Sequence, residues 1–123
     1  MRARPRGDIV SISSAATVHM GANSAPYNMA KAALEALSAT LAKEERRNGI
    51  RVNVVAPGLV DTEMGRRLVK GAMGVTDIRT MDSGAPFGHV CTPEEIADAV
   101  RFLVSDRGGY ITGQRLGVDG GAF

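Results

Sequence analysis

The chain has 123 residues, of which 44% are hydrophobic and 23% charged, a balance typical of one soluble globular domain. Its formal net charge of +2 is too small and too scattered for a nucleic-acid surface, and no apolar stretch approaches the ~20 residues that cross a bilayer. We therefore expect neither a nucleic acid nor a membrane as a partner, and Cys91, the only cysteine, excludes an intrachain disulfide and favours a reducing, cytoplasmic location.

The first predicted element is a short buried strand over residues 8–13, where β-branched residues dominate. Residues 14–25 are small and polar, which favours a loop. A long helix is predicted next, with Ser24 or Asn23 near its cap and Pro26 in its first turn. Apolar residues recur along this helix at three- and four-residue steps and predict one buried face: Ala30, Ala33, Leu34, Leu37 and Leu41.

Gly49 supplies the left-handed stop of that helix. The valine-rich residues 50–56 predict a second strand, which Pro57 breaks. Residues 61–90 mix glycines, methionines and charges without a sustained period, so we expect a short helix and a mobile loop there.

A further helix is predicted to begin at Thr92, since Pro93 occupies the first helical position and Glu95 completes a capping box. Residues 106–109 end this helix, and residues 113–118 predict the last strand. The face of the helix that we expect to be buried consists of Ile96, Ala97, Val100, Leu103 and Val104. Strands that alternate with helices of this length favour right-handed crossovers and a parallel sheet of the α/β class.

Ligands on such sheets bind beyond the carboxyl ends of the strands, so the residues that directly follow each strand are candidates for a site. Ser14 follows the first strand, while Tyr27 and Lys31 share a face at the start of the long helix. A tyrosine can protonate a carbonyl oxygen that gains negative charge as hydride is added, and a lysine cation lowers the pKa of the phenol. A serine hydroxyl can hold the substrate oxygen. An isolated Tyr-x-x-x-Lys is more often an amphipathic helix face than a catalytic motif, so its assignment depends on the surrounding residues.

Those residues form four stretches that together are highly specific: Gly7–Ser14, Tyr27–Lys31, Arg51–Gly58 and Ile111–Gly121. In this combination the chain resembles the short-chain dehydrogenase/reductase family, and in particular members like 3-oxoacyl-acyl-carrier-protein reductase. The resemblance implies a Rossmann-like, doubly wound parallel sheet, of which residues 1–123 form the catalytic C-terminal part, with three strands and crossover helices.

The resemblance also implies a role for each candidate residue. Ser14 corresponds to the catalytic serine, Tyr27 to the acid/base, and Lys31 to its activator and a ligand of the nicotinamide ribose. Four residues correspond to the segment that holds the nicotinamide ring and its carboxamide: Pro57, Gly58, Val60 and Thr62. Ser13 competes with Ser14, because neighbours in a strand point to opposite faces, and the thirteen-residue spacing to Tyr27 favours Ser14.

The family's glycine-rich nucleotide turn and the position that separates NAD from NADP have no counterpart here. We therefore expect the N-terminal nucleotide-binding half to be absent, the cofactor to be NAD or NADP, and residues 8–13 to form an unpaired sheet edge. The expected activity is hydride transfer with a small-molecule carbonyl or alcohol, as part of a longer or complemented chain.

Two further expectations concern assembly and alternatives. A homo-oligomer is expected through the helix that contains Tyr27 and through the C-terminal helix–strand unit. The alternative function is that of a catalytically inactive, truncated fragment that serves as an association module. A late start codon, a split gene or a genuine truncation would each account for the missing half. A sugar-nucleotide epimerase shares Tyr-x-x-x-Lys but carries a longer substrate domain, and so is less favoured. His19, His89 and Cys91 lack ligand-spaced partners, so no metal site is expected.

Overall fold

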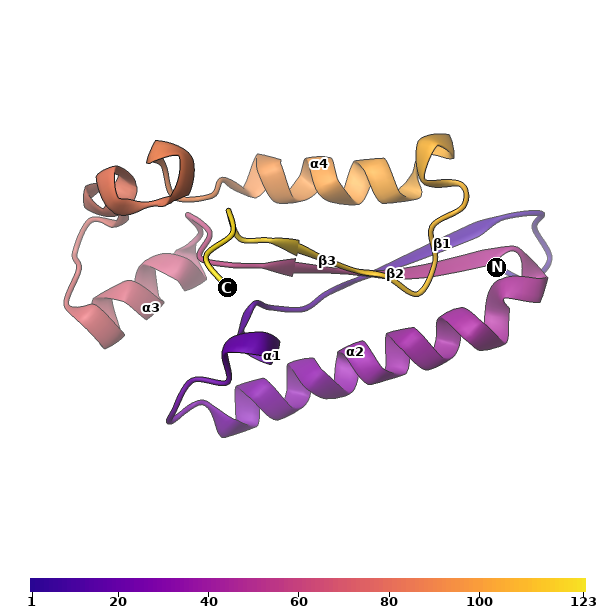
Figure 1. The fold of residues 1–123 in the computed structure, drawn as a ribbon, viewed down its shortest axis with the longest axis horizontal. Coiled ribbons are helices and arrows are strands. Elements are labelled where there is room, and N and C mark those ends of the chain that lie inside the picture. Colours follow the sequence, from indigo (N-terminus) through magenta and orange to yellow (C-terminus); the bar gives the residue numbers. More distant parts are fainter.

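Three parallel strands form the centre of the structure, a computed structural model that describes residues 1–123. The sheet contains β1 (Gly7–Ile12), β2 (Ile50–Pro57) and β3 (Arg115–Val118), in the order β1-β2-β3. Helix α2 (Ala25–Glu45) covers one face of this sheet and α4 (Pro93–Val104) covers the other (Figure 1). The predicted α/β class and parallel sheet are confirmed, and β1 is an edge strand, as expected.

The core follows the central strand. Every residue of β2 except Pro57 is buried, because neighbouring strands flank it and helices cover both of its faces. Val52 and Val55 are the largest side chains that are fully buried, and Val52 packs with Ile50 and Ala42 of α2. The segment between β2 and α4, called the insert below, has a separate apolar cluster of its own, formed by Val69, Ile78 and Val90.

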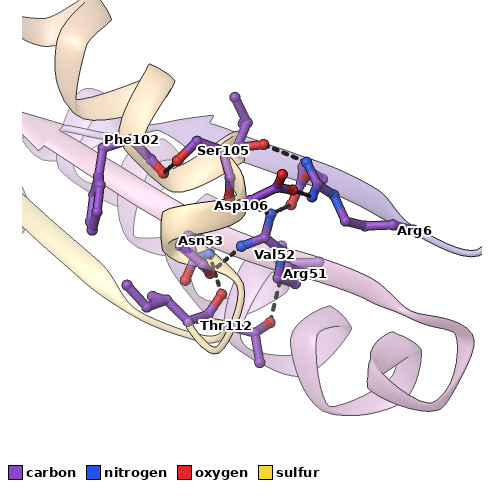
Figure 2. A network of polar contacts seen from close by, with 12 residues as sticks. Arg6, Arg51, Val52, Asn53, Phe102, Ser105, Asp106 and Thr112 are labelled. Carbon is purple, nitrogen blue, oxygen red and sulfur yellow. Dashed lines mark hydrogen bonds and ion pairs between the residues drawn. The ribbon is translucent and has the colours of Figure 1, made fainter.

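Two polar residues of β2 hold the segment between α4 and β3 in place (Figure 2). The Asn53 amide donates to the Ile111 carbonyl at 3.0 Å and accepts from the Gln114 backbone N–H at 3.0 Å. The backbone N–H of Val52 donates to the Thr112 hydroxyl at 3.0 Å. These contacts satisfy backbone groups that the short strand β3 leaves unpaired, so the loop enters β3 in one register.

Arg51 is the second polar residue of β2 that holds this segment, and it is buried at the amino end of the sheet. It forms an ion pair with Asp8 of β1, with 2.7 Å between the charged atoms, and donates to the carbonyls of Gly108 and Ser105. Arg6 extends the network to Asp106 (Figure 2). The end of α4 is therefore tied to β1 and β2 by these charged contacts as well as by the buried Leu103.

Helix α2 has the predicted ends but not the predicted buried face. Pro26 lies in its first turn, and Gly49, in the left-handed conformation with φ +70°, ends the short 3-10 turn that follows. The residues that face the protein are Asn28, Ser38, Ala42 and Glu45, together with the half-buried Lys31, Leu34, Glu35 and Leu41. Ala30, Ala33 and Leu37 are exposed, so the prediction was wrong for most of the face.

The connecting segments contain more helix than predicted. The loop expected over residues 14–25 includes a one-turn helix, α1 (Ala16–His19). The insert contains α3 (Glu63–Met73), followed by 3-10 turns at Ile78–Gly84 and Pro86–Gly88. This agrees with the short helix predicted there.

Helix α4 begins with the predicted capping box: Thr92 and Glu95 each bond the other's backbone N–H. Within the predicted face of α4, Ala97 is exposed, whereas Leu103 is buried. None of the helices is long and apolar enough to cross a membrane.

Candidate functional site

The carboxyl ends of the parallel strands gather the residues that the sequence singled out. Ser14 follows β1, and the segment Pro57–Thr62 ends and follows β2. Helix α2 starts at this same end of the sheet, near α1, and brings Tyr27 and Lys31 with it (Figure 1). The predicted residues are therefore on neighbouring elements of one edge, where α/β sheets bind their ligands.

Lys31 is fixed against the end of β1. Its ammonium donates to the Ile12 carbonyl at 2.9 Å and lies 5.9 Å from the centre of the Tyr27 ring. This distance is within the range of a cation–π contact. Tyr27 itself is 43% exposed, so its phenol is open to a ligand. The pair thus presents a positive charge and an accessible hydroxyl on one side of α2.

The two adjacent serines have different surroundings. Ser13 is buried, and its hydroxyl donates to Oε1 of Glu35 on α2 at 2.5 Å. Ser14 is half-buried, and its hydroxyl oxygen accepts the backbone N–H of Ala16 at 3.1 Å. An oxygen that accepts from a backbone amide keeps its own proton free to donate. Ser13 therefore has a structural partner, whereas Ser14 retains a free donor.

Glu35, which sequence reasoning missed, collects several hydrogen bonds beside these serines. Its Oε1 atom accepts from Ser13, from the Thr17 hydroxyl at 2.7 Å and from Nε of Arg115 on β3 at 3.0 Å. Burial raises the pKa of Glu35, but these hydrogen bonds outweigh burial and the net pKa is lowered. The group therefore stays ionised at neutral pH.

Close backbone contacts shape the segment after β2. A Cβ added to Gly58 would lie 3.0 Å from Cβ of Asp119, and the Gly58 N–H donates to the Val118 carbonyl at 3.1 Å. Val60 forms an isolated parallel bridge with Cys91. The Thr62 hydroxyl caps α3 by accepting the Gly65 N–H at 3.1 Å. The segment is a tightly built turn that leads from the sheet edge into α3.

A cavity of about 680 Å³ lies at the β2 and β3 end of this edge, next to the segment between β2 and α4. It is enclosed by Leu59, the 3-10 turns of the insert, the start of α4 and the tail after β3, whereas Ser14, Tyr27 and Lys31 do not line it. The tail residue Phe123 lines the cavity and packs against exposed His19, with 5.0 Å between ring centroids and the rings tilted by 59°. The cavity is lined mainly by apolar residues, and the titratable groups in its wall are His89, Cys91, Glu95 and Asp119.

Titratable groups in the cavity wall pair with one another. Nε2 of His89 lies 2.8 Å from Oε1 of Glu95, and this contact raises the pKa of His89. Burial, followed by the neighbouring Glu95, raises the pKa of the Cys91 thiol to about 11. Cys91 is therefore protonated at neutral pH and a poor nucleophile. No cluster of three or more His, Cys, Asp or Glu side chains is arranged to hold a metal ion.

Comparison with known proteins gives consistent matches over nearly the whole chain. A family model described as Enoyl-(Acyl carrier protein) reductase matches residues 1–122. The chain is 41% identical over 120 residues to short-chain dehydrogenase fogB of Aspergillus ruber, covering 98% of this chain and 43% of that protein. It is 43% identical over 117 residues to the 3-oxoacyl-[acyl-carrier-protein] reductase FabG of Chlamydia muridarum, covering 94% and 44%.

A solved structure agrees with these relatives. The crystallised 7α-hydroxysteroid dehydrogenase, complexed with NADH and 7-oxo glycochenodeoxycholic acid, superposes with a TM-score of 0.86 at 30% identity, over 98% of this chain and 46% of that one. The chain thus spans less than half the length of each of these three proteins.

Proposed function

Because the chain belongs to the short-chain dehydrogenase/reductase family of oxidoreductases, we propose that it carries the catalytic residues for NAD(P)-dependent hydride transfer to or from a small-molecule carbonyl or alcohol. The observation that supports this most is the arrangement at the sheet edge, where Lys31 lies beside the ring of Tyr27 and bonds the strand that leads to Ser14. Catalysis takes place within a longer or complemented chain.

Tyr27 is the general acid and base of the proposed reaction. In reduction its phenol gives a proton to the substrate oxygen, and in oxidation its phenolate removes the proton from the alcohol. The phenolate is stabilised by the Lys31 ammonium, which the Ile12 carbonyl holds at 2.9 Å. The exposure of Tyr27 leaves its hydroxyl accessible to a substrate.

Ser14 orients the substrate oxygen in this proposal. Its hydroxyl oxygen accepts the Ala16 N–H, so its proton points to a different acceptor, and the substrate oxygen takes that place. Ser13 is unsuited to the role, since it is buried and bonded to Glu35. This difference supports Ser14 over its neighbour.

The residues present fit the nicotinamide end of a dinucleotide. Tyr27 and Lys31 offer a hydroxyl and an ammonium for its ribose, and the turn of Pro57, Gly58, Val60 and Thr62 offers backbone groups and a hydroxyl for its carboxamide. Gly58 suits this turn, because a side chain there would press against Asp119. When bound, NAD or NADP supplies or accepts the hydride.

A homo-oligomer formed through α2 is part of the proposal. The outward face of α2 exposes apolar residues, with Leu37 60% exposed and Met29 70% exposed, and a contiguous apolar face of this kind marks an interaction surface. The same observation favours the second candidate function, an inactive association module. A cytoplasmic location also belongs to the proposal, since Cys91 is a free thiol.

Titration with NADH and with NADPH, followed by nicotinamide fluorescence, tests the proposal together with turnover of simple ketones and 3-oxoacyl thioesters. Both are measured on the purified chain alone and on the complemented chain, that is, together with the part of the relative FabG that this chain does not span. We expect Tyr27→Phe to bind cofactor somewhat more weakly, because it loses one ribose contact, and to lose turnover by roughly 10²- to 10⁴-fold, the usual contribution of a general acid or base. Tyr110→Phe is the matched control, because Tyr110 is fully exposed in the loop before β3.

Equal turnover in Tyr27→Phe and wild type would overturn the catalytic role. Neither cofactor binding nor turnover, combined with a dimer or tetramer in sedimentation that Leu37→Glu dissociates, would favour the association module instead. The two candidate functions therefore give different results in the same set of measurements.

A further inference from the structure

A hydrogen-bonded group on the α2 face of the sheet joins four elements behind Ser14. Oε1 of Glu35 on α2 accepts from Ser13 at the end of β1, from Thr17 on α1 and from Arg115 on β3. The Glu35 and Arg115 side chains are 21% and 30% exposed, so the ion pair is partly shielded from water. Its strength therefore exceeds that of an ordinary surface pair.

The guanidinium of Arg115 also contacts the turn that carries Ser14. Its Nη2 atom donates to the Ser14 carbonyl at 3.2 Å and to the Thr17 hydroxyl at 3.0 Å, while Nε binds Glu35. Arginine suits this place because its planar fork reaches several acceptors at once. The backbone of Ser14 is thereby attached to β3, on the far side of β2.

The backbone bonds of the turn hold the neighbours of Ser14 to β2, and the side-chain group adds a contact to the Ser14 peptide itself. Backbone bonds fix the residues on both sides of Ser14, from Ser13 to Val55 at 2.8 Å and from Ala15 to Pro57 at 2.8 Å. The Ser14 peptide has no backbone partner on a neighbouring strand, and its carbonyl accepts from Arg115 and from the Thr17 N–H of the one-turn helix that follows. A shift of the Ser14 peptide would move its hydroxyl, which the Ala16 N–H orients.

We propose that Glu35 and Arg115 are positioning residues that hold the Ser14 hydroxyl in its reactive orientation. Glu35 fixes Ser13 and Thr17, which flank the turn, and Arg115 fixes the Ser14 carbonyl within it. The inference rests on the proposed function, because it assigns a catalytic purpose to Ser14. Neither residue contacts the reacting atoms.

The test combines hydrogen exchange with kinetics on the full chain, for the variants Glu35→Gln, Arg115→Gln and the double variant. The Ala16 N–H donates to Ser14 Oγ. We expect its hydrogen-exchange rate to rise about tenfold in each variant, while the exchange rate of the Val52 amide in β2 is unchanged. Arg101→Gln is the control, since Arg101 is 78% exposed on α4 and has only a 3.6 Å contact with Asp98. Arg115→Lys keeps the charge but not the fork, and should restore less than half of the lost protection.

In turnover assays we expect kcat to fall by about ten- to a hundredfold with cofactor affinity unchanged, since small misplacements of a catalytic group have effects of this size. The double variant should be no worse than the more affected single variant, because the two residues act as one unit. An equal rise in exchange at Ala16 and Val52, or a loss of cofactor binding with kcat intact, would overturn the inference. A wild-type chain without turnover, both alone and complemented, would refute the proposed function for this chain, yet the exchange data would still decide whether the pair positions Ser14.

Discussion

Two glycines of helix α3 are predicted to respond in opposite directions to the same substitution. Gly65 is buried in the first turn, where a Cβ would lie 2.0 Å from the Val60 carbonyl oxygen. Gly71 is exposed near the other end of the helix, with nothing within 4 Å of an added Cβ. Gly65→Ala and Gly71→Ala therefore differ in surroundings but not in chemistry.

The magnitudes follow from these contacts. In a helix, alanine is about 0.5–1 kcal/mol more favourable than glycine, and Gly71→Ala should gain an amount in this range. At Gly65 the new contact is far shorter than the 3.4 Å at which ordinary van der Waals contact begins. The backbone near Val60 must move, and overpacking of this kind costs about 1–3 kcal/mol, which exceeds the helical gain.

Thermal denaturation followed by circular dichroism measures both effects. With about 4 °C per kcal/mol for a domain of this size, Gly65→Ala should melt several degrees below the wild type and Gly71→Ala slightly above it. Because Val60 and Thr62 belong to the proposed nicotinamide segment, Gly65→Ala should also weaken cofactor binding, whereas Gly71→Ala should not. A Gly65→Ala variant as stable as Gly71→Ala would refute the role of this close contact.

Three further predictions concern stability. Arg51→Met removes the closer of the two arginines that pair with Asp8, which keeps only its 3.3 Å contact with Arg6, and should destabilise the protein by about 2 kcal/mol in urea denaturation, whereas Arg101→Met should have almost no effect. Thr92→Ala removes half of the capping box and should cost about 1 kcal/mol; an unchanged midpoint would mean that the cap is dispensable. Hydrogen bonds from Arg2 and Asn48 lower the pKa of Glu45 from 4.5 to about 2, so its stabilising effect is present above pH 4.5 and disappears as the pH falls towards 2. The difference in urea midpoint between wild type and Glu45→Gln should shrink over that range, and a constant difference would contradict it.

Local signals in the sequence predicted most element boundaries. Gly49 ends the turn after α2 with a positive φ, which glycine adopts without strain, and Thr92 begins α4 with the predicted capping box. The predicted strand over residues 8–13 differs from β1 (Gly7–Ile12) by one residue at each end. Such boundaries depend on residues that are close in sequence, so they can be predicted from one sequence without knowledge of the tertiary structure.

The position of the candidate site was predictable to the level of the sheet edge. That Ser14, Tyr27 and Lys31 lie at one edge was predictable, because Ser14 comes just after β1 and the other two lie at the start of α2. The bond from Lys31 to the Ile12 carbonyl was not predictable, since it depends on how closely α2 packs on β1. Helix α1 was also missed, because a single turn has no periodicity that distinguishes it from a polar loop.

The misassigned face of α2 and the missed residue Glu35 have the same cause. The side chains of Ser11 and Ser13 on and after β1 face α2, and they need polar partners there: Ser38 Oγ lies 2.9 Å from Ser11 Oγ, and Glu35 accepts from Ser13. A rule based on apolar periodicity assigns such helix residues to the solvent side. The inward face of the helix therefore mixes Glu35 and Ser38 with apolar residues such as Ala42, and Leu37 lies outside.

This mixed face has a consequence for catalysis. Apolar side chains tolerate small sliding motions, whereas hydrogen bonds between fixed donors and acceptors specify one geometry. The helix that carries Tyr27 is bonded through Glu35 and Ser38 to β1 and its end, which lead to Ser14. These directional hydrogen bonds fix the position of the Tyr27 hydroxyl relative to the Ser14 hydroxyl, the two proposed catalytic groups. Ser38→Ala should therefore lower kcat even at temperatures where the variant remains fully folded. A lower melting temperature with kcat unchanged would instead indicate that packing alone positions α2.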